Sequence, residues 1–400
     1  MASTTPLAIL LLVMPVASVL QFRAVAPLAI GALVATVVAG WRAERRVPWP
    51  RGAVLWAALA LAGWGAASAA WAVDPRRAAV EALLLGAFFA LGAAAAGVIA
   101  RAEAPAHRTL LRRLALGLAV GVVLAAVDHA SGNAVRAAVR GLRAWDVTLS
   151  FGLKPAITVF AVLLPIALAA PIAGWMRWAL AVVAVAVALW LPAETAKLAI
   201  LAGLVAYGLG RVLPRLTRAA IAGALAIAIL GMPVILGAVL ARAPAGPLPF
   251  SAAHRVVIWD FVTDRIAERP LLGWGFESSR AIPGGKANAT PVTLDRLGIT
   301  DPTQRARFAL PSAESLPLHP HNAPLQLHLE LGLVGAALAA LLAAMLALRA
   351  RHPGAIGALA AAAVVGSLSY GLWQGWWIAL LLVLVAASRA LPGQRREDIP

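Results

Sequence analysis

The sequence predicts an all-α integral membrane protein with about twelve transmembrane helices and one long, partly helical loop between helices 9 and 10. Composition is the first reason: 62% of the 400 residues are hydrophobic and only 13% are charged, whereas soluble domains are nearer half apolar and a quarter charged. The second reason is that the apolar residues form runs long enough to span a bilayer. Helices at the surface of a soluble protein would show a polar face, which these runs lack.

The apolar runs divide the chain into three parts. We expect them at residues 5–21, 25–41, 53–72, 79–100, 110–128, 155–173, 175–192, 197–213, 219–241, 324–348, 354–372 and 374–391. Residues 1–241 then form transmembrane helices 1–9, residues 242–323 form a loop domain, and residues 324–400 form helices 10–12 with a short tail. The first run lacks a preceding basic segment and the second follows almost at once, so we expect a retained helix, not a cleaved signal peptide.

Arginine-rich loops set the predicted orientation, because loops on the cytoplasmic side of a membrane carry an excess of Lys and Arg. With a cytoplasmic N-terminus, the inner loops hold basic clusters such as those within residues 42–51 and 101–113, and the short outer loops hold fewer basic residues. Both termini are therefore expected in the cytoplasm. The long segment 242–323 is expected on the opposite side.

The formal net charge of +17 and the absence of cysteine narrow the range of possible functions. Inner arginines are explained by anionic lipid headgroups, and a chain of this kind is not expected to bind nucleic acid. The outer basic residues favour an anionic ligand, such as a pyrophosphate or an acidic glycan. Without cysteine there is no disulfide or thiolate chemistry. No His/Asp/Glu pattern has metal-ligand spacing, so neither a metal ion nor a cofactor is expected.

The most informative stretch lies where the long loop meets the tenth apolar run. His319, His321 and Asn322 gather at the end of the loop, and an imidazole at that boundary can accept a proton near neutral pH. His328 follows His321 by two helical turns and shares its face. Glu330 lies deeper, where an acid needs a partner or a cavity; a histidine, an arginine or a lysine is the expected partner.

The loop itself begins with a predicted amphipathic helix near residues 251–269. Ser251 is suited to cap its N-terminus, and Pro270 closes it. Its apolar stripe is expected to lie on the membrane surface and consists of Val257, Phe261, Val262 and Ile266. Residues 281–318, rich in Gly, Pro, Ser, Thr and Arg, are expected to form a mobile loop or lid.

Two short patterns follow within this loop. Arg255 and Trp259 are four residues apart, so they share a helix face, and a guanidinium over an indole is a reasonable cation–π pair. Such a pair would equally well only stiffen the helix. Gly273 and Gly275 then permit a tight turn and a close backbone approach.

These patterns together resemble the O-antigen ligase and O-antigen polymerase superfamily. The shared order is Arg255-x-x-x-Trp259, Pro270-Leu-Leu-Gly-x-Gly, His321-Asn322 and, nine residues later, Gly332-x-x-Gly335. The segment from Gly371 to Trp377 resembles another feature of bacterial members. Ala336 departs from the pattern, because the family usually has Ser or Thr there. The resemblance covers nearly the whole chain in topology, but only about residues 251–336 in motif.

The resemblance implies a multi-pass glycosyltransferase of the bacterial inner membrane with its active site facing the periplasm. Family members transfer a glycan from undecaprenyl pyrophosphate to a sugar hydroxyl, on lipid A–core in the ligases and on a growing glycan in the polymerases. The implied partners are that lipid-linked donor, one of these acceptors and the membrane lipids. Neither a nucleotide sugar nor a metal ion is needed.

The resemblance also assigns roles, and a diphosphate leaving group explains them, because a guanidinium fork suits phosphate oxygens. Arg255 is expected to hold the pyrophosphate, and His321 to act as the base toward the acceptor hydroxyl. The further expected substrate-binding residues are Lys154, Lys197, Arg280, Asn322, Trp259, His328 and Glu330. The two lysines, at outer helix ends, would also be explained as interfacial residues.

Other classes stay open. A transporter or flippase of lipid-linked glycans predicts inverted repeats and charges at mid-membrane, whereas here the charges cluster at helix ends. A non-catalytic scaffold leaves the loop motifs unexplained. A repeat-unit polymerase of the same superfamily and a protein-glycosylating oligosaccharyltransferase share this outline.

Overall fold

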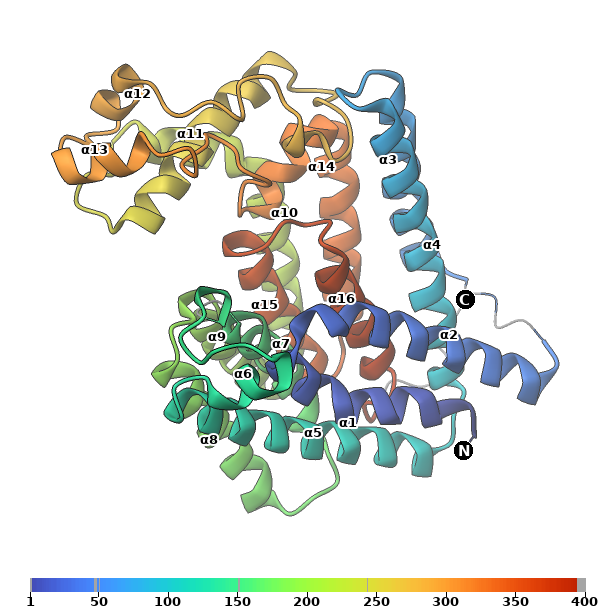
Figure 1. Cartoon of the computed structure of the whole chain (residues 1–400). Helices are drawn as coiled ribbons and strands as arrows, with labels where there is room; N and C mark the ends of the chain where they lie inside the picture. Colours follow the sequence, from blue (N-terminus) through green and yellow to red (C-terminus); the bar gives the residue numbers. More distant parts are fainter. Residues whose placement is uncertain (1, 47–48, 50, 150–151, 243, 394–400) are drawn as a thin grey trace.

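The computed structural model describes residues 2–46, 49, 51–149, 152–242 and 244–393. Within these ranges the regular elements are helices, with one isolated β-bridge between Asn288 and Glu314 (Figure 1). The predicted all-α class is therefore confirmed.

Each predicted apolar run corresponds to one α-helix. These are α1 (Thr5–Leu20), α2 (Val25–Glu44), α3 (Ala53–Ala67), α4 (Pro75–Ala100), α5 (Ala104–Ala130), α7 (Leu153–Ala167), α8 (Gly174–Trp190), α9 (Glu194–Val212), α10 (Pro214–Leu240), α14 (Ala323–Arg349), α15 (Pro353–Leu368) and α16 (Gly375–Ser388). The 3₁₀ turn η1 (Ala2–Thr4) precedes α1. The short helix α6 (Ala134–Arg140) and the 3₁₀ turns η2 (Phe22–Ala24), η3 (Ser68–Ala70) and η4 (Val147–Leu149) lie between the longer helices.

The helix lengths establish a helical membrane protein but not a count of twelve spans. In the described part of the chain, 7 helices are long and apolar enough to cross a membrane, and α1, α7, α8, α15 and α16 are apolar but shorter. Figure 1 also shows α1, α2 and α5 running across the direction of α3, α4, α10 and α14, which is not a single parallel bundle. The twelve-span topology therefore stays a prediction.

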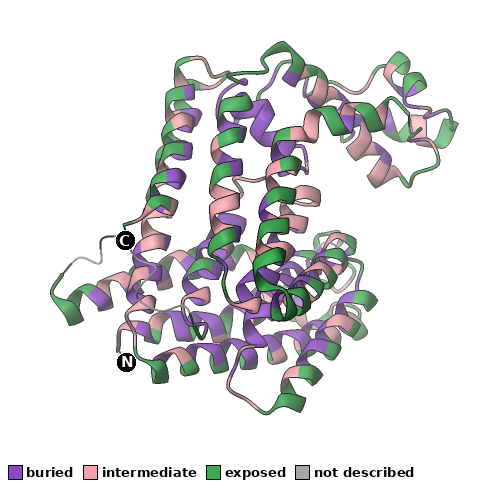
Figure 2. Cartoon of the chain, turned by 180° about the vertical axis from the view of Figure 1, so that it is seen from behind, coloured by how far each residue is buried: buried purple, intermediate pink, exposed green. Residues whose placement is uncertain are grey.

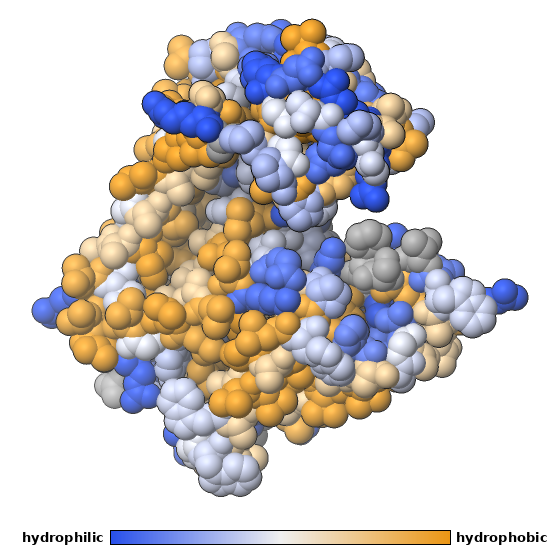
Figure 3. Space-filling model, turned by 90° about the vertical axis from the view of Figure 1, so that its left-hand side faces the viewer, coloured by the Kyte–Doolittle hydropathy of each residue, from blue (hydrophilic) through white to orange (hydrophobic). Residues whose placement is uncertain are grey.

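The core lies around α7, whose residues from Pro155 to Ala167 are all buried. A helix that is apolar and covered on every side belongs in the interior of a larger bundle. The outward faces of the surrounding helices carry exposed Leu, Val and Trp residues, visible as alternating buried and exposed positions in Figure 2. Figure 3 shows extensive hydrophobic surface on the helical body, while hydrophilic residues gather on the upper lobe. Apolar exposure on that scale indicates contact with lipid.

The predicted loop domain is a folded lobe. It contains α11 (Phe250–Glu268), η5 (Ser278–Arg280), α12 (Pro291–Arg296) and α13 (Pro302–Phe308). One small core packs Val257 of α11 against residues of α12 and α13 such as Leu294 and Phe308. A second packs α11 against α10 and α14. Residues 281–318 thus include two short helices packed on a small core, and the mobility expected of a loop or lid stays a prediction.

Two predicted details of helix α11 were wrong. Pro249 occupies the N-cap position, so Ser251 is inside the helix and does not cap it. The predicted apolar stripe faces protein, because Val257, Val262 and Ile266 are buried in the two lobe cores. The fork of Arg296 adds a bidentate ion pair to the buried Asp260, with both N···O distances at 2.7 Å, which fastens α12 to α11. The buried part of this stripe therefore packs within the protein and is not free to contact lipid.

Candidate functional site

Helix α14 is broken at Gly332, where the backbone has φ 65° and ψ −167°. The segment that follows α11 supplies the hydrogen bonds that the break removes. The amides of Trp274 and Gly275 donate to the carbonyls of Leu329 and Glu330, both at 2.8 Å. Irregular backbone within an apolar helix is tolerated where other protein groups satisfy it, and this crossing does so.

Backbone groups on the opposite side of the break also form hydrogen bonds with other parts of the chain. The Leu333 amide donates to the Pro270 carbonyl at 2.9 Å, and the Trp64 indole donates to the Leu331 carbonyl at 3.0 Å. Gly273 is needed because a Cβ there would lie 2.6 Å from the Glu330 carbonyl carbon. The two glycine motifs noted in the sequence therefore form one crossing of backbone on backbone.

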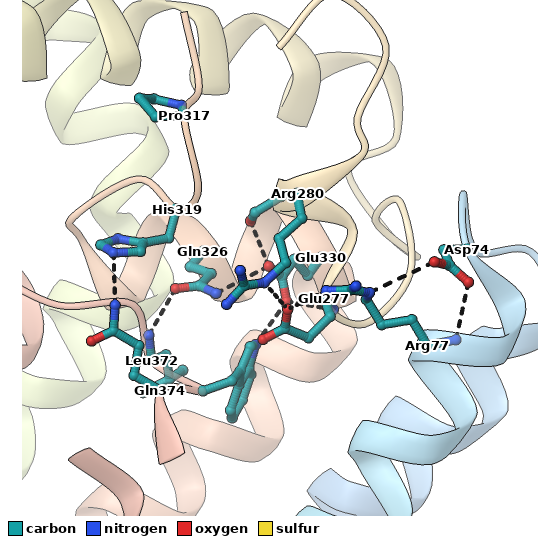
Figure 4. Close-up of polar contacts among 12 residues, drawn as sticks. Asp74, Arg77, Glu277, Arg280, Pro317, His319, Gln326, Glu330, Leu372 and Gln374 are labelled. Atoms are coloured by element: carbon teal, nitrogen blue, oxygen red, sulfur yellow. Dashed lines mark hydrogen bonds and ion pairs between the residues drawn. The ribbon is translucent and has the colours of Figure 1, made fainter. Parts of the chain in front are cut away.

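The crossing places the Glu330 carboxylate in a buried cluster of hydrogen-bond donors (Figure 4). Glu330 is 0% exposed. Its Oε2 accepts from the Glu277 amide at 2.9 Å and from the Trp373 indole at 2.7 Å, and its Oε1 accepts from Ser279 Oγ and from Gln326 Nε2. The expected cationic partner is not observed within the described chain, since these four neutral donors surround the carboxylate.

A second carboxylate, Glu277, links two arginines above this cluster. Arg280 Nε donates to Glu277 Oε2 at 2.6 Å, and Arg77 of α4 lies 3.9 Å from the same oxygen, as Figure 4 shows. Burial raises the pKa of Glu277, and Arg280 opposes that shift. The predicted site residue Arg280 is thus held by a carboxylate, with its guanidinium part exposed.

His319 and His321 stand next to each other, with ring centroids 4.2 Å apart. His321 Nδ1 lies 2.5 Å from the Ser369 carbonyl oxygen. Because a carbonyl only accepts, Nδ1 carries the proton and Nε2 keeps its lone pair. Burial lowers the pKa of His321, so the ring is neutral at pH 7 and Nε2 is able to accept a proton.

The neighbouring His319 is buried and its Nε2 contacts the Gln374 amide at 3.0 Å. Burial, and then the positive charges of His321, Arg280 and Arg255, lower its pKa to about 3. His319 is therefore a neutral structural ring beside His321.

Arg255 lies near both histidines, since its charge lowers the pKa of each. Burial is the cause of the lowered pKa of Arg255 itself, although a guanidinium stays charged in proteins. No hydrogen bond or ion pair to Arg255 is found among the described residues. A partly desolvated guanidinium without a counter-charge favours an anionic ligand.

The side chains of Asn322 and Trp259 stabilise this arrangement by hydrogen bonds to backbone groups. Asn322 Oδ1 caps α14 by accepting from the Leu325 amide at 3.0 Å. The Trp259 indole donates to the Pro320 carbonyl at 2.8 Å, which holds the histidine loop against α11. No ring contact with Arg255 is found in the described structure, so the expected cation–π pair does not form. Both residues are positioned to shape the loop.

His328 lies on the other side of α14, where Nε2 is 2.8 Å from the Ile229 carbonyl of α10. Its side chain is buried, and only 5% of the residue is exposed. The contact joins α14 to α10, and His328 is not part of the proposed substrate site.

Lys154 and Lys197 lie at the starts of α7 and α9, two helices that contact residues 368–370. Thr158 of α7 contacts the Tyr370 hydroxyl, and Thr195 of α9 contacts the Leu368 carbonyl, each at 3.4 Å. Lys197 is paired with Glu194 at 2.8 Å. Lys154 lines a cavity of about 250 Å³ with Arg136 and His129. These lysines are on elements that meet the site, but they are not in its hydrogen-bonded centre.

Several site residues had no signal of their own in the sequence. Gln326, Ser369, Trp373 and Gln374 complete the hydrogen bonds around Glu330 and the histidines. Trp373 and Gln374 fall within the segment that carried a family resemblance, which was the available hint. Among the described residues, no three His, Asp or Glu side chains are grouped closely enough to hold a metal ion.

The fold and the site define a helical membrane protein with an imidazole, an unpaired arginine and a buried carboxylate at the junction of a polar lobe and a broken apolar helix. Residues 179–340, less than half of the chain, match the family model described as "O-Antigen ligase". The match includes α11, both histidines and the break in α14. It confirms the resemblance to the O-antigen ligase superfamily.

Curated relatives agree over a shorter stretch. Proteins described as "putative polysaccharide ligase" are similar in Rickettsia prowazekii (36% identical over 135 residues), Rickettsia typhi (35% over 136) and Rickettsia conorii (33% over 141). Each match covers 32% of this chain and 29% of the relative. The chain thus aligns with less than a third of the length of these relatives.

Proposed function

We propose that this protein transfers a glycan from undecaprenyl pyrophosphate to a sugar hydroxyl at the periplasmic face of the bacterial inner membrane. The family match and the relatives support a ligase- or polymerase-like transfer. The observation that carries the proposal is the pairing of an unpartnered Arg255 with a neutral His321 whose Nε2 is free to act as a base. The Arg255 guanidinium suits the anionic leaving group, and the His321 imidazole suits the hydroxyl nucleophile.

The reaction is a displacement at the anomeric carbon of the donor sugar. The acceptor hydroxyl oxygen forms the new C–O bond, and His321 Nε2 takes the hydroxyl proton. The bond from the anomeric carbon to the pyrophosphate oxygen breaks, and its electron pair stays on that oxygen. Undecaprenyl pyrophosphate leaves with the added negative charge, which Arg255 stabilises. Loss of the proton to water returns His321 to its starting form.

Arg280 is the second cation of this site. Its charge, like that of Arg255, acts on His319, and Glu277 accepts a hydrogen bond from its guanidinium. Lys154 and Lys197 would serve the more distant phosphate or glycan, because their helices meet the segment that holds His321. Asn322 and Trp259 would act by holding the loop that carries His321.

The topology completes the proposal. Twelve spans, both termini in the cytoplasm and a periplasmic lobe of residues 242–323 agree with the distribution of basic residues. The apolar outer faces would contact membrane lipids. A lipid A–core acceptor makes the protein a ligase, and a growing glycan makes it a repeat-unit polymerase.

The test is the lipopolysaccharide profile of a deletion strain that expresses the wild type, Arg255→Ala or His321→Ala at matched levels. A ligase defect leaves bare core while lipid-linked polymer accumulates, and a polymerase defect leaves core that bears one unit. Loss of a flippase would instead trap single units on the cytoplasmic side. Normal ladders from both variants would contradict the assigned roles.

A further inference from the structure

The Glu330 carboxylate accepts from donors in three separate parts of the chain and is 0% exposed. Glu277 and Ser279 follow the glycine crossing, Gln326 is one turn earlier on α14, and Trp373 lies beyond α15. An ionised carboxylate offers about four acceptor positions, and these four donors occupy them. None of the described arginines, lysines or histidines forms an ion pair with Glu330.

This environment favours an acceptor-only side chain. The Glu277 amide and the Trp373 indole can only donate, so a proton on Oε2 would meet two donors. On Oε1 a proton would require the Ser279 hydroxyl to turn from donor to acceptor. A glutamine of the same shape would turn its NH₂ group toward two of the donors. The buried amide would then lose hydrogen bonds that the carboxylate makes, and unsatisfied buried polar groups are costly.

The carboxylate also sets the direction of Gln326. Gln326 Nε2 donates to Glu330 Oε1 at 3.0 Å, which leaves Gln326 Oε1 to accept from the Leu372 amide at 2.8 Å. Together with the direct bond from the Trp373 indole, this fixes residues 369–374, which we call the connector, between α15 and α16. The Gln374 amide contacts His319 at the end of the same connector, as Figure 4 shows.

The connector in turn holds the imidazole that the proposed function uses. The carbonyl oxygen of its first residue, Ser369, accepts a hydrogen bond from His321 Nδ1 at 2.5 Å. We propose that Glu330 is a positioning residue for the glycan transfer: it fixes the connector so that the Ser369 carbonyl selects the tautomer of His321 with a free Nε2. This inference rests on the proposed function, and it adds a residue that touches neither donor nor acceptor.

The groups that act electrostatically on His321 are few. Arg255 and His254 of α11 face it from the lobe, and His319 lies beside it on the same loop. The hydrogen bond to Ser369 raises the pKa of His321, and burial lowers it. Losing the connector would therefore remove a hydrogen bond that favours the protonated ring. The acid limb of a rate–pH profile would move to lower pH as the rate falls.

The experiment measures transfer by the full-length protein in lipid, with a lipid-linked glycan donor and a saccharide acceptor, between pH 4 and pH 8. Glu330→Gln is expected to lower kcat by roughly 100-fold, with little change in KM for the donor and an acid limb at lower pH. Glu330→Asp keeps an acceptor-only group and is expected to recover part of the rate. Glu44→Gln, which alters an exposed ion pair with Arg101, is the matched control and should keep the wild-type profile.

A milder change covers the case in which Glu330→Gln does not fold. Trp373→Phe keeps a ring against Phe276, whose centroid is 4.6 Å from that of Trp373, and removes one donor to Glu330. It should lower kcat and move the acid limb in the same direction. A wild-type rate and acid limb in either folded variant would overturn the inference. If wild-type protein transfers no glycan, or His321→Ala transfers it normally, the proposed function fails instead.

Discussion

His328 Nε2 donates to the Ile229 carbonyl oxygen at 2.8 Å, and the reason is found one turn later in α10. The helical donor to that oxygen would be the amide of residue 233, which is a proline inside the helix and has no N–H. A histidine of α14 thus replaces the hydrogen bond that a proline of α10 removes. This joins the broken helix to its neighbour at a point that is buried from solvent.

His328→Ala is expected to destabilise the folded protein by roughly 0.6–1.7 kcal/mol, which runs from the average to the largest value measured for hydrogen bonds between membrane helices. Glycan transfer by the folded fraction should be unchanged. The matched control is Pro233→Ala, which returns an N–H to the Ile229 carbonyl. In that background His328→Ala should cost less stability, and a cost equal to that in the wild type would contradict the proposed pairing. Reversible unfolding in detergent gives the free energy of unfolding of the wild type, the two single variants and the double variant.

Gly332→Ala is expected to prevent stable folding. Gly332 has φ 65°, which is costly for a side-chain-bearing residue, and an added Cβ would enter the Leu271 carbonyl. Gly63→Ala is the control, because that glycine lies inside α3 with open space around it, where Ala gains up to about 1 kcal/mol in helix propensity. Detergent-stable yield and melting temperature distinguish them, and a folded Gly332→Ala protein at wild-type yield would argue against the tight crossing.

The rate of transfer should stay constant as pH falls below 6.5 and decrease only at more acidic pH. His321 must be unprotonated to accept a proton, and burial lowers its pKa from 6.5. A lowered pKa means that the neutral ring persists to lower pH, so the acid limb of kcat lies below the ordinary histidine value. A limb at or above pH 6.5 would show that another group, or a differently placed His321, governs the reaction.

Arg280→Ala should raise the KM for the lipid-linked donor more than it lowers kcat, because we propose Arg280 as the second cation of the donor site and Glu277 already holds it. The expected change in KM is about tenfold, corresponding to roughly 1.4 kcal/mol. Arg242→Ala is a useful comparison, since Arg242 is exposed and contacts only a carbonyl of its own helix among the described residues. Equal KM values for the two variants would remove Arg280 from the donor site.

The membrane class could be predicted from the sequence because length and hydropathy of a helix are local properties. Each apolar run became a helix, and the ends of α11 were close to prediction. The break in α14 could not be predicted, since it depends on a second backbone segment reaching Gly332. The glycines at 273, 275 and 332 were visible, but their mutual contact is a tertiary fact.

The contacts of the candidate site could be predicted only in part, because most of them also depend on tertiary structure. The family resemblance brought Arg255 and His321 into one proposal, which stays a prediction, and the charge of Arg255 lowers the pKa of His321. The partners of Glu330 were mispredicted as cations, because sequence spacing gives no access to Trp373 or Ser279, which lie 43 and 51 residues away. Trp259 was paired with Arg255 from helical spacing alone, yet its indole bonds to Pro320.

The most direct measurement is single-turnover transfer by purified protein in lipid, with a defined undecaprenyl-pyrophosphate-linked glycan and a saccharide acceptor. We predict that His321→Ala and Arg255→Ala each lower the rate by roughly 100-fold to 1,000-fold, while binding of the acceptor is retained. Wild-type rates from either folded variant would contradict the joint action of this imidazole and this guanidinium.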